Sequence, residues 1–318
     1  MELSFAPMEG LTYSIYRRLH AELFPGADRY YAPFIAPDST GHFKAGNLRD
    51  VLPENNMGIR LVPQLLCNAA APFLAVAGEL EKLGYEEVNL NAGCPSGTVV
   101  SKHKGAGMLG DLGQFDACLA AIFESCPLRV SVKTRLGLHS VSEFPAIVEV
   151  CQKYPLSRLI VHVRDRDGMY RSAPDREAFA AAQSCPFPVE YNGNLFTPAD
   201  LQSLCRRYPS LNAAMLGRGA VTNPALFRQL RGGDGLSAPE LQCFHDRLAE
   251  EYLSAGLAPH YTVARMKELW FYQLCMFPGG ERAGKAILKT RSLSDYRAAV
   301  AALFANVPLD PNACFRQV

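Results

Sequence analysis

The chain has 318 residues, of which 48% are hydrophobic and 20% are charged, and its net charge is +1. This composition is that of an ordinary globular protein, and it excludes nucleic-acid binding driven by overall charge. The length exceeds that of a typical single domain and predicts one large domain with a smaller one beside it.

Cysteine usage and hydropathy indicate the compartment. The ten cysteines are scattered without CxxC spacing, which predicts a reducing compartment and neither a disulfide scaffold nor a zinc site. No apolar run approaches the ~20 residues that span a bilayer, and the start of the chain lacks the pattern of a secretory leader. We expect a cytoplasmic monomer without metal or membrane contact.

Eight short apolar or β-branched runs recur along the first two thirds of the chain, at 3–6, 30–35, 59–65, 87–90, 130–133, 159–163, 189–191 and 213–216. Segments of helical period lie between most of them, at 70–83, 114–125 and 142–154. Alternating strands and helices predict parallel βαβ units, and eight units fit a (β/α)₈ TIM barrel of the α/β class. A doubly wound open sheet is the alternative, but the first βα region lacks the dinucleotide glycine fingerprint.

The pattern changes at the glycine-rich segment 232–237, after which helical stretches follow near 239–255, 262–276, 280–290 and 293–305. We therefore predict a barrel domain over 1–235 and a small all-helical domain over 236–318. Between His260 and Arg297 this helical part carries seven basic and three acidic residues. A solvated helical face gives such a pattern, but a position beside a barrel mouth favours a polyanion-binding face.

Cys94 is the strongest single candidate for chemistry. It follows a predicted buried strand, in the segment Asn91-Ala92-Gly93-Cys94-Pro95. Most cysteines in a globular chain are small core residues. A thiol between glycine and proline, on a loop that leaves the carboxyl end of a strand, is instead typical of a barrel active site.

Polar residues follow the other predicted strands in the same way. Glycines after the seventh and eighth strands suit the close approach of a phosphate, and Arg218 suits its oxygens. Lys133 at a buried strand end requires an anionic or electron-rich partner, such as the reducible edge of a flavin. The pattern predicts a flavin mononucleotide (FMN) site, although these residue types also permit another phosphorylated ring. The site consists of Pro7, Met8, Glu9, Gln64, Lys133, His162, Asn192, Gly193, Asn194, Gly217 and Arg218.

The chain resembles the tRNA-dihydrouridine synthases, a family of FMN-dependent barrel enzymes. The resembling segments are 6–10, 62–65, 89–95, 132–137, 161–164, 192–194, 215–220, 223–224 and, in the helical domain, 263–267. Two positions depart from the family pattern: Val163 stands where a glycine is usual, and Ala32-Pro33-Phe34 replaces a common Thr-Glu-Phe.

The resemblance implies that NADPH reduces FMN, that hydride passes from the flavin to C6 of a D-loop uridine in tRNA, and that Cys94 protonates C5. A thiol with an ordinary pKa of about 8.5 is protonated near pH 7 and can serve as this acid. We assign substrate contacts to Asn91, Arg135, Arg265, Lys267 and Arg282.

Two other functions fit parts of the pattern. An FMN-dependent reductase of a free pyrimidine, similar to dihydroorotate dehydrogenase, shares the barrel but does not need a basic helical domain. An RNA-binding protein that has lost catalysis does not need Cys94, Lys133 or Arg218.

Overall fold

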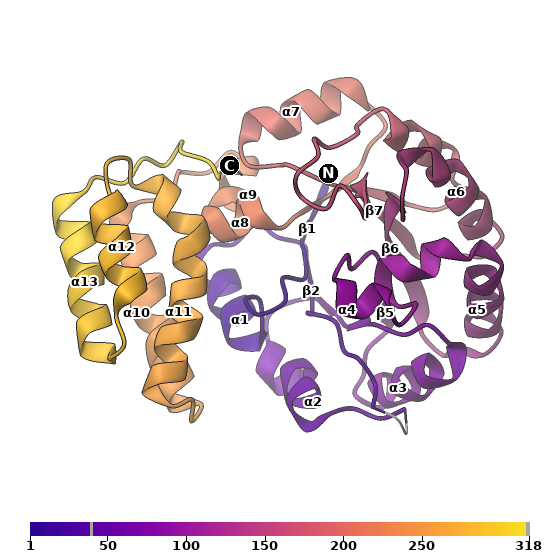
Figure 1. The fold of residues 1–318 in the computed structure, drawn as a ribbon, viewed down its shortest axis with the longest axis horizontal. Helices are drawn as coiled ribbons and strands as arrows, with labels where there is room; N and C mark the ends of the chain where they lie inside the picture. Colours follow the sequence, from indigo (N-terminus) through magenta and orange to yellow (C-terminus); the bar gives the residue numbers. More distant parts are fainter. Residues whose placement is uncertain (39–40, 316–318) are drawn as a thin grey trace.

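The computed structural model describes residues 1–38 and 41–315. Its larger part is a barrel of nine short strands that pair in parallel, in the order β3-β2-β1-β9-β8-β7-β6-β5-β4 (Figure 1). The strands are β1 (Glu2–Phe5), β2 (Arg29–Tyr31), β3 (Leu61–Val62), β4 (Gln64–Leu65), β5 (Glu87–Ala92), β6 (Arg129–Gly137), β7 (Arg158–Asp165), β8 (Val189–Asn192) and β9 (Ala213–Leu216). The predicted (β/α)₈ barrel is therefore confirmed, and the open doubly wound sheet is wrong.

The barrel closes through a broken strand. The single run predicted over 59–65 forms two strands, β3 and β4, on either side of Pro63. Proline has no N–H to donate to a sheet ladder, so the strand is interrupted there. Because β3 pairs with β2 and β4 pairs with β5, the two pieces join the edges of the sheet.

Two strands extend further than the sequence pattern predicts. The ladder between β6 and β7 continues beyond Lys133 to the pairs Arg135–His162 and Gly137–Asp165, with a register shift between them. Lys133 and His162 therefore lie inside their strands and not at the ends, because the polar residues that follow them also pair. This correction brings Arg135 and Arg164 onto the barrel wall.

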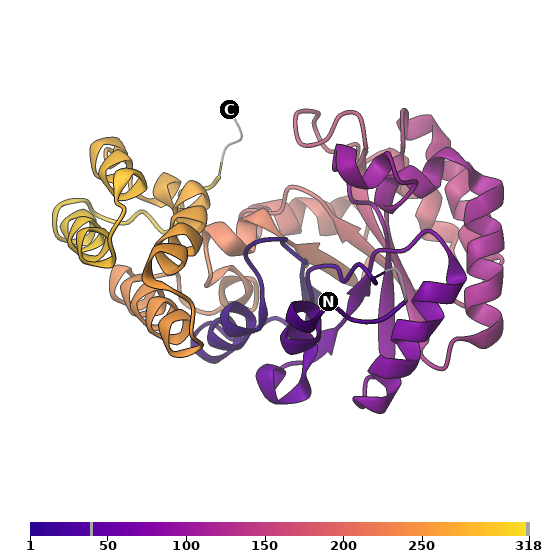
Figure 2. The same ribbon diagram turned by 60° about the horizontal axis from the view of Figure 1, so that its bottom comes forward.

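Helices surround the barrel (Figures 1 and 2). They are α1 (Ser14–Leu23), α2 (Ala45–Val51), α3 (Ala70–Lys82), α4 (Gly97–Val100), α5 (Leu112–Ser125), α6 (Phe144–Gln152), α7 (Pro198–Arg207), α8 (Arg218–Thr222) and α9 (Leu226–Leu230). Short 3₁₀ helices cover Pro53–Asn56, Gly105–Gly110, Val141–Glu143 and Ala178–Ser184. The start predicted for α7 is present as a capping box between Thr197 and Asp200, with proline at the first turn.

The last four helices form a bundle beside the barrel (Figures 1 and 2). They are α10 (Ala238–Ser254), α11 (Pro259–Gln273), α12 (Glu281–Lys289) and α13 (Leu293–Asn306), with a 3₁₀ turn at Leu274–Met276. The buried Trp270 stacks on His245 with ring centroids 4.3 Å apart, and its indole N–H donates to Tyr296 Oη at 2.8 Å. The bundle contacts the barrel where α10 packs on α1 and α11 on α8.

The predicted boundary between residues 235 and 236 falls in the loop between α9 and α10. Within the described parts of the chain, no helix has the length and apolar character needed to cross a membrane.

Candidate active site

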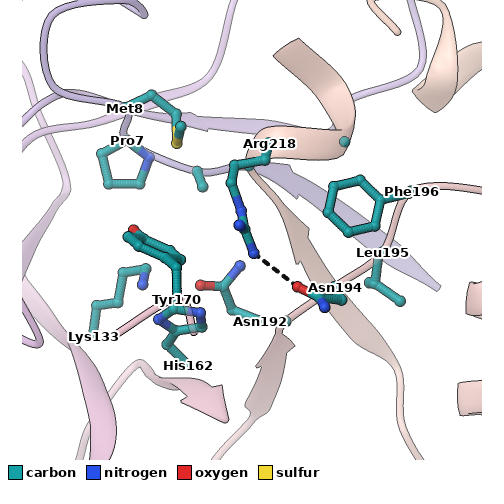
Figure 3. A pocket seen from close by; sticks show the side chains of 14 residues that line it. Pro7, Met8, Lys133, His162, Tyr170, Asn192, Asn194, Leu195, Phe196 and Arg218 are labelled. Carbon is teal, nitrogen blue, oxygen red and sulfur yellow. Dashed lines mark hydrogen bonds between the residues drawn. The ribbon is translucent and has the colours of Figure 1, made fainter. Parts of the chain in front are cut away.

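Two adjoining hollows lie at the carboxyl end of the barrel strands. Their shared wall consists of Pro7, Met8, Lys133, His162 and Tyr170. One hollow, the anion pocket, extends toward Asn194 and Arg218 (Figure 3), and the other, the thiol pocket, extends toward Cys94. Every barrel residue that the sequence predicts for the site lines at least one of them, including Glu9, Gln64, Asn91, Arg135, Asn192, Gly193 and Gly217.

Two guanidinium groups converge on Asn194, which lines the anion pocket with Arg218. Arg218 and Arg164 both donate to Asn194 Oδ1, at 2.8 and 3.0 Å, and Arg164 Nε also donates to the Ser172 carbonyl at 2.8 Å. The amide of Asn192 donates to the Met215 carbonyl at 2.9 Å and so connects β8 to β9. Asn192 therefore stabilises the strand pairing beside the pocket, and Asn194 positions the two guanidinium groups.

The basic groups at this barrel mouth destabilise one another's protonated forms. Burial and the nearby charge of Arg135 lower the pKa of Lys133 to about 7. Burial, together with Arg218 and Arg135, lowers the pKa of Arg164 to about 10. A bound anion relieves this repulsion, because an opposite charge favours the protonated forms.

His162 is a neutral donor in this cluster. Burial and the surrounding cations hold its pKa well below its ordinary value, so the ring is uncharged near pH 7. Arg164 lies 3.2 Å from Nε2 of His162. A guanidinium only donates, so Nε2 accepts and the ring proton is on Nδ1.

One predicted glycine has a packing reason of its own. A Cβ on Gly193 would stand 2.7 Å from Tyr191 Oη and from Val163 Cγ2, both too close. A side chain on Gly217 would meet only Met8 and Ala6, at 3.3 and 3.4 Å. The packing of the barrel wall therefore requires a glycine at position 193. At Gly217 the lack of a side chain lets the backbone line the pocket directly.

A chain of amide groups crosses the barrel interior to the thiol pocket. Asn89 donates to Ser131 Oγ at 2.9 Å and accepts from Gln64 at 2.7 Å. Gln64 in turn accepts from Asn91 Nδ2 at 2.7 Å. The Oδ1 atom of Asn91 accepts the backbone N–H groups of Gly93 and Cys94, at 3.0 and 2.9 Å. The Asn91 oxygen is therefore used to fix the Cys94 loop.

Arg135 holds the same loop from the other side. It is buried, and it donates to the carbonyls of Gly93 at 2.8 Å, Asp165 at 2.9 Å and Met169 at 3.2 Å. Both Asn91 and Arg135 line the thiol pocket, as predicted, but their described hydrogen bonds position the loop. Their contacts to substrate stay predictions.

The thiol itself is half-buried, and burial raises the pKa of Cys94 above its ordinary value. Cys94 is therefore a protonated thiol near pH 7, which suits a proton donor better than a nucleophile. Glu9, at the rim of the thiol pocket, accepts a hydrogen bond from the Tyr13 hydroxyl at 3.0 Å.

The three residues predicted on the helical domain lie outside both hollows. Arg265 donates to the Gly10 carbonyl and lies 5.0 Å from the Tyr13 ring, so it ties α11 to the loop after β1. Lys267 donates to the Thr290 carbonyl at the end of α12. Arg282 is exposed on α12. Their roles toward a partner stay predictions, but the first two have intramolecular functions that the sequence did not indicate.

The sequence did not indicate several residues that line or contact the site, among them Arg164, Tyr170, Phe196 and Tyr272. Arg164 could have been found, because it lies two positions after His162 on one strand and so faces the same side. Tyr170, Phe196 and Tyr272 line the hollows from loops and from the helical bundle, where no periodic pattern marks them.

Comparisons with known proteins agree with this geometry. The model of the family described as Dihydrouridine synthase (Dus) matches residues 4–264. The chain is 30% identical to tRNA-dihydrouridine(16) synthase of Escherichia coli K12, over 86% of this chain and 89% of that protein. It is 26% identical to tRNA-dihydrouridine synthase B of Pseudomonas putida KT2440, over 88% and 84%.

Solved structures support the fold. Morphinone reductase in complex with tetrahydroNAD is similar, with a TM-score of 0.52 and 12% identity, over 76% of this chain and 90% of that one. A variant of NCR from Zymomonas mobilis also has a TM-score of 0.52, with 14% identity over 73% and 86%. The match of the family model over most of the chain shows that this protein is an enzyme of the dihydrouridine synthase family.

Proposed function

We propose that this enzyme uses FMN and NADPH to reduce D-loop uridines of tRNA to 5,6-dihydrouridine. The names of its relatives support tRNA as the substrate. The observation that carries the proposal is the shared wall of the two hollows, which connects a cluster of cations to a protonated thiol.

The residues of the anion pocket fit a flavin nucleotide. Arg218 supplies a guanidinium group for a phosphate, the buried Arg164 holds Asn194 beside it, and Gly217 leaves room for the approach of the phosphate. Lys133 and His162 lie on the wall shared with the thiol pocket and would hold the ring of such a molecule. When bound, reduced FMN supplies the hydride that adds to C6 of the uracil ring.

Cys94 provides the proton for the other carbon. Its S–H bond breaks as a C–H bond forms at C5, and the resulting thiolate regains a proton from solvent. Burial, which raises the pKa of the thiol, keeps this proton in place before substrate arrives. Asn91 and Arg135 serve this step by fixing the Cys94 loop.

The helical bundle supplies an exposed basic surface for the RNA. Arg282, Lys285 and Lys289 are exposed on α12, at spacings that place them on one side of the helix. A stacked uridine must turn out of the RNA to reach a buried pocket, so the enzyme requires contacts with the backbone around it.

Mapping of dihydrouridine tests the proposal. Purified enzyme with FMN and NADPH is incubated with tRNA from a strain that lacks dihydrouridine synthases, and free uracil and dihydroorotate are tested in parallel. Formation of dihydrouridine at a D-loop position is the expected result. Turnover of a free pyrimidine with no change in tRNA would replace the proposal with a dihydroorotate dehydrogenase-like activity.

A further inference from the structure

Three aromatic rings surround the guanidinium of Arg218. Its central carbon lies over the rings of Tyr170, Phe196 and Phe315, at 4.6, 5.7 and 5.9 Å from their centroids. All three distances are within the range of cation–π attraction. Figure 3 shows Tyr170 and Phe196 on either side of Arg218, which donates to Asn194 between them.

The rings come from three separate segments. Tyr170 lies on the loop after β7, Phe196 on the loop after β8, and Phe315 on the C-terminal tail that follows α13. The tail is held to the bundle by the Asp310 amide, which donates to the Met276 carbonyl at 2.8 Å. Residues more than 100 positions apart in sequence thus meet at one cation.

Phe315 connects the helical bundle to the barrel. Its ring centroid lies 5.2 Å from that of Tyr272 and 5.6 Å from that of Phe271, both on α11. On the barrel side it lies 6.3 Å from the ring of Phe196. The position of Phe315 is therefore fixed from both sides of the site.

Aromatic neighbours restrict a guanidinium without occupying its hydrogen-bond donors. The five N–H groups of arginine lie in one plane, whereas attraction to a ring face acts on the charge as a whole. Rings around Arg218 therefore reduce the side-chain freedom that binding of an anion must otherwise remove.

We propose that Tyr170, Phe196 and Phe315 form an aromatic cage that positions Arg218 for the phosphate of the flavin nucleotide, so that the C-terminal tail is part of the cofactor site. The inference rests on the proposed function, because it takes FMN as the anion. The three cage residues are positioning residues, which act on the cofactor through Arg218.

Equilibrium binding of FMN to flavin-free enzyme, followed by flavin fluorescence, tests the cage. Tyr170→Ala and Phe315→Ala are each expected to raise the dissociation constant about 3- to 10-fold, the range of a partly buried cation–π contact. Tyr170→Phe and Phe315→Tyr keep a ring and should restore binding, whereas Phe315→Leu keeps the volume without the ring and should not. Phe123→Ala, which removes a ring on α5 that stacks on Tyr154 in the loop after α6, is the matched control and should bind normally.

A double-mutant cycle shows whether the rings act through Arg218. In an Arg218→Ala background, Tyr170→Ala and Phe315→Ala should have no further effect on FMN binding. Equal effects with and without Arg218, full rescue by leucine, or unchanged binding in both alanine variants would each overturn the cage. Those three outcomes leave the proposed function intact. Failure of the unmodified enzyme to bind FMN would overturn the proposed function together with the cage, so the two failures can be distinguished.

Discussion

The basic residues of the barrel mouth and those of the helical bundle differ in their surroundings. At the mouth, Lys133, Arg135 and Arg164 lie close together, and burial with mutual repulsion lowers their pKa values. On α12, Arg282 and Lys285 are exposed to solvent. Crowded, desolvated cations select one small anion of fixed shape, whereas spread, solvated cations suit a long polyanion. The same residue types in these two settings therefore suit two different kinds of partner.

The sharpest way to separate the two regions is to remove the thiol of the barrel mouth. Cys94→Ala is expected to keep FMN and its reduction by NADPH but to lower the rate of tRNA reduction ~10²- to 10⁴-fold, because a general acid typically contributes that much. Stopped-flow flavin bleaching and dihydrouridine formation are measured on the same preparation. Near-normal turnover on tRNA would show that another group provides the proton.

The barrel-mouth cations should affect the binding of FMN and not the binding of tRNA. Arg218→Ala is expected to weaken FMN binding roughly 10- to 100-fold, the usual loss for a hydrogen bond to a charged group. Excess FMN should restore activity in part, and tRNA binding should not change. Full flavin occupancy after extensive dialysis of the variant would contradict the role of Arg218.

Lys133 makes FMN binding at the barrel mouth depend on pH, in contrast to anion binding by the exposed cations of the bundle. Burial and Arg135 lower its pKa to about 7, while Glu190 and Cys94 act in the opposite direction. An anion binds the protonated form, so binding above pH 7 must take up a proton, and FMN affinity should fall as pH rises. The decrease approaches about tenfold per pH unit until the pKa of the complex is reached.

Titration of FMN between pH 6 and 9, with Lys133→Met as the comparison, measures this dependence. The variant should bind FMN more weakly at pH 6 and lose most of the slope. Glu190, whose pKa burial raises to about 7, titrates in the same window, so Glu190→Gln is examined in parallel. If the pH dependence of FMN affinity persists in Lys133→Met and disappears in Glu190→Gln, it belongs to Glu190 and not to Lys133.

The smallest expected effect concerns the bundle. Neutralising Arg282, Lys285 and Lys289 together should flatten the salt dependence of tRNA binding by about 0.7 to 0.9 in log K against log salt for each lost phosphate contact. NADPH-driven flavin reduction should be unaffected.

The matched comparison is the pair Arg265 and Lys267, which the sequence also suggested. Both are tied to backbone carbonyls, so their substitution should change domain packing more than the salt slope. An unchanged slope in the exposed triple variant would place the RNA elsewhere on the enzyme.

The sequence predicted the barrel and its mouth because both depend on local patterns. Apolar runs mark the strands, and residues that follow a strand must lie at one end of a parallel barrel. The lengths of β6 and β7 were underestimated, since Arg135 and Arg164 are charged residues within strands that face a polar interior. The break at Pro63 could have been read from its missing N–H.

Other parts of the site depend on contacts between distant segments. Tyr170 and Phe315 lie in irregular segments without periodicity, and nothing near them in sequence indicates a partner at Arg218. Asn91 and Arg135 were correctly placed in the pocket. Their hydrogen bonds to the Cys94 loop, however, become evident only when the backbone of that loop is known.

The path of the C-terminal tail has a practical consequence for purification. Phe315 contacts Arg218, so a sequence fused directly after Phe315 begins beside the anion pocket. Met1 lies at the start of β1, at the opposite end of the barrel, where its carbonyl accepts from Arg231 at 2.9 Å. Enzyme carrying an N-terminal tag should therefore be isolated with more flavin, and more yellow, than enzyme with the same tag fused directly after Phe315.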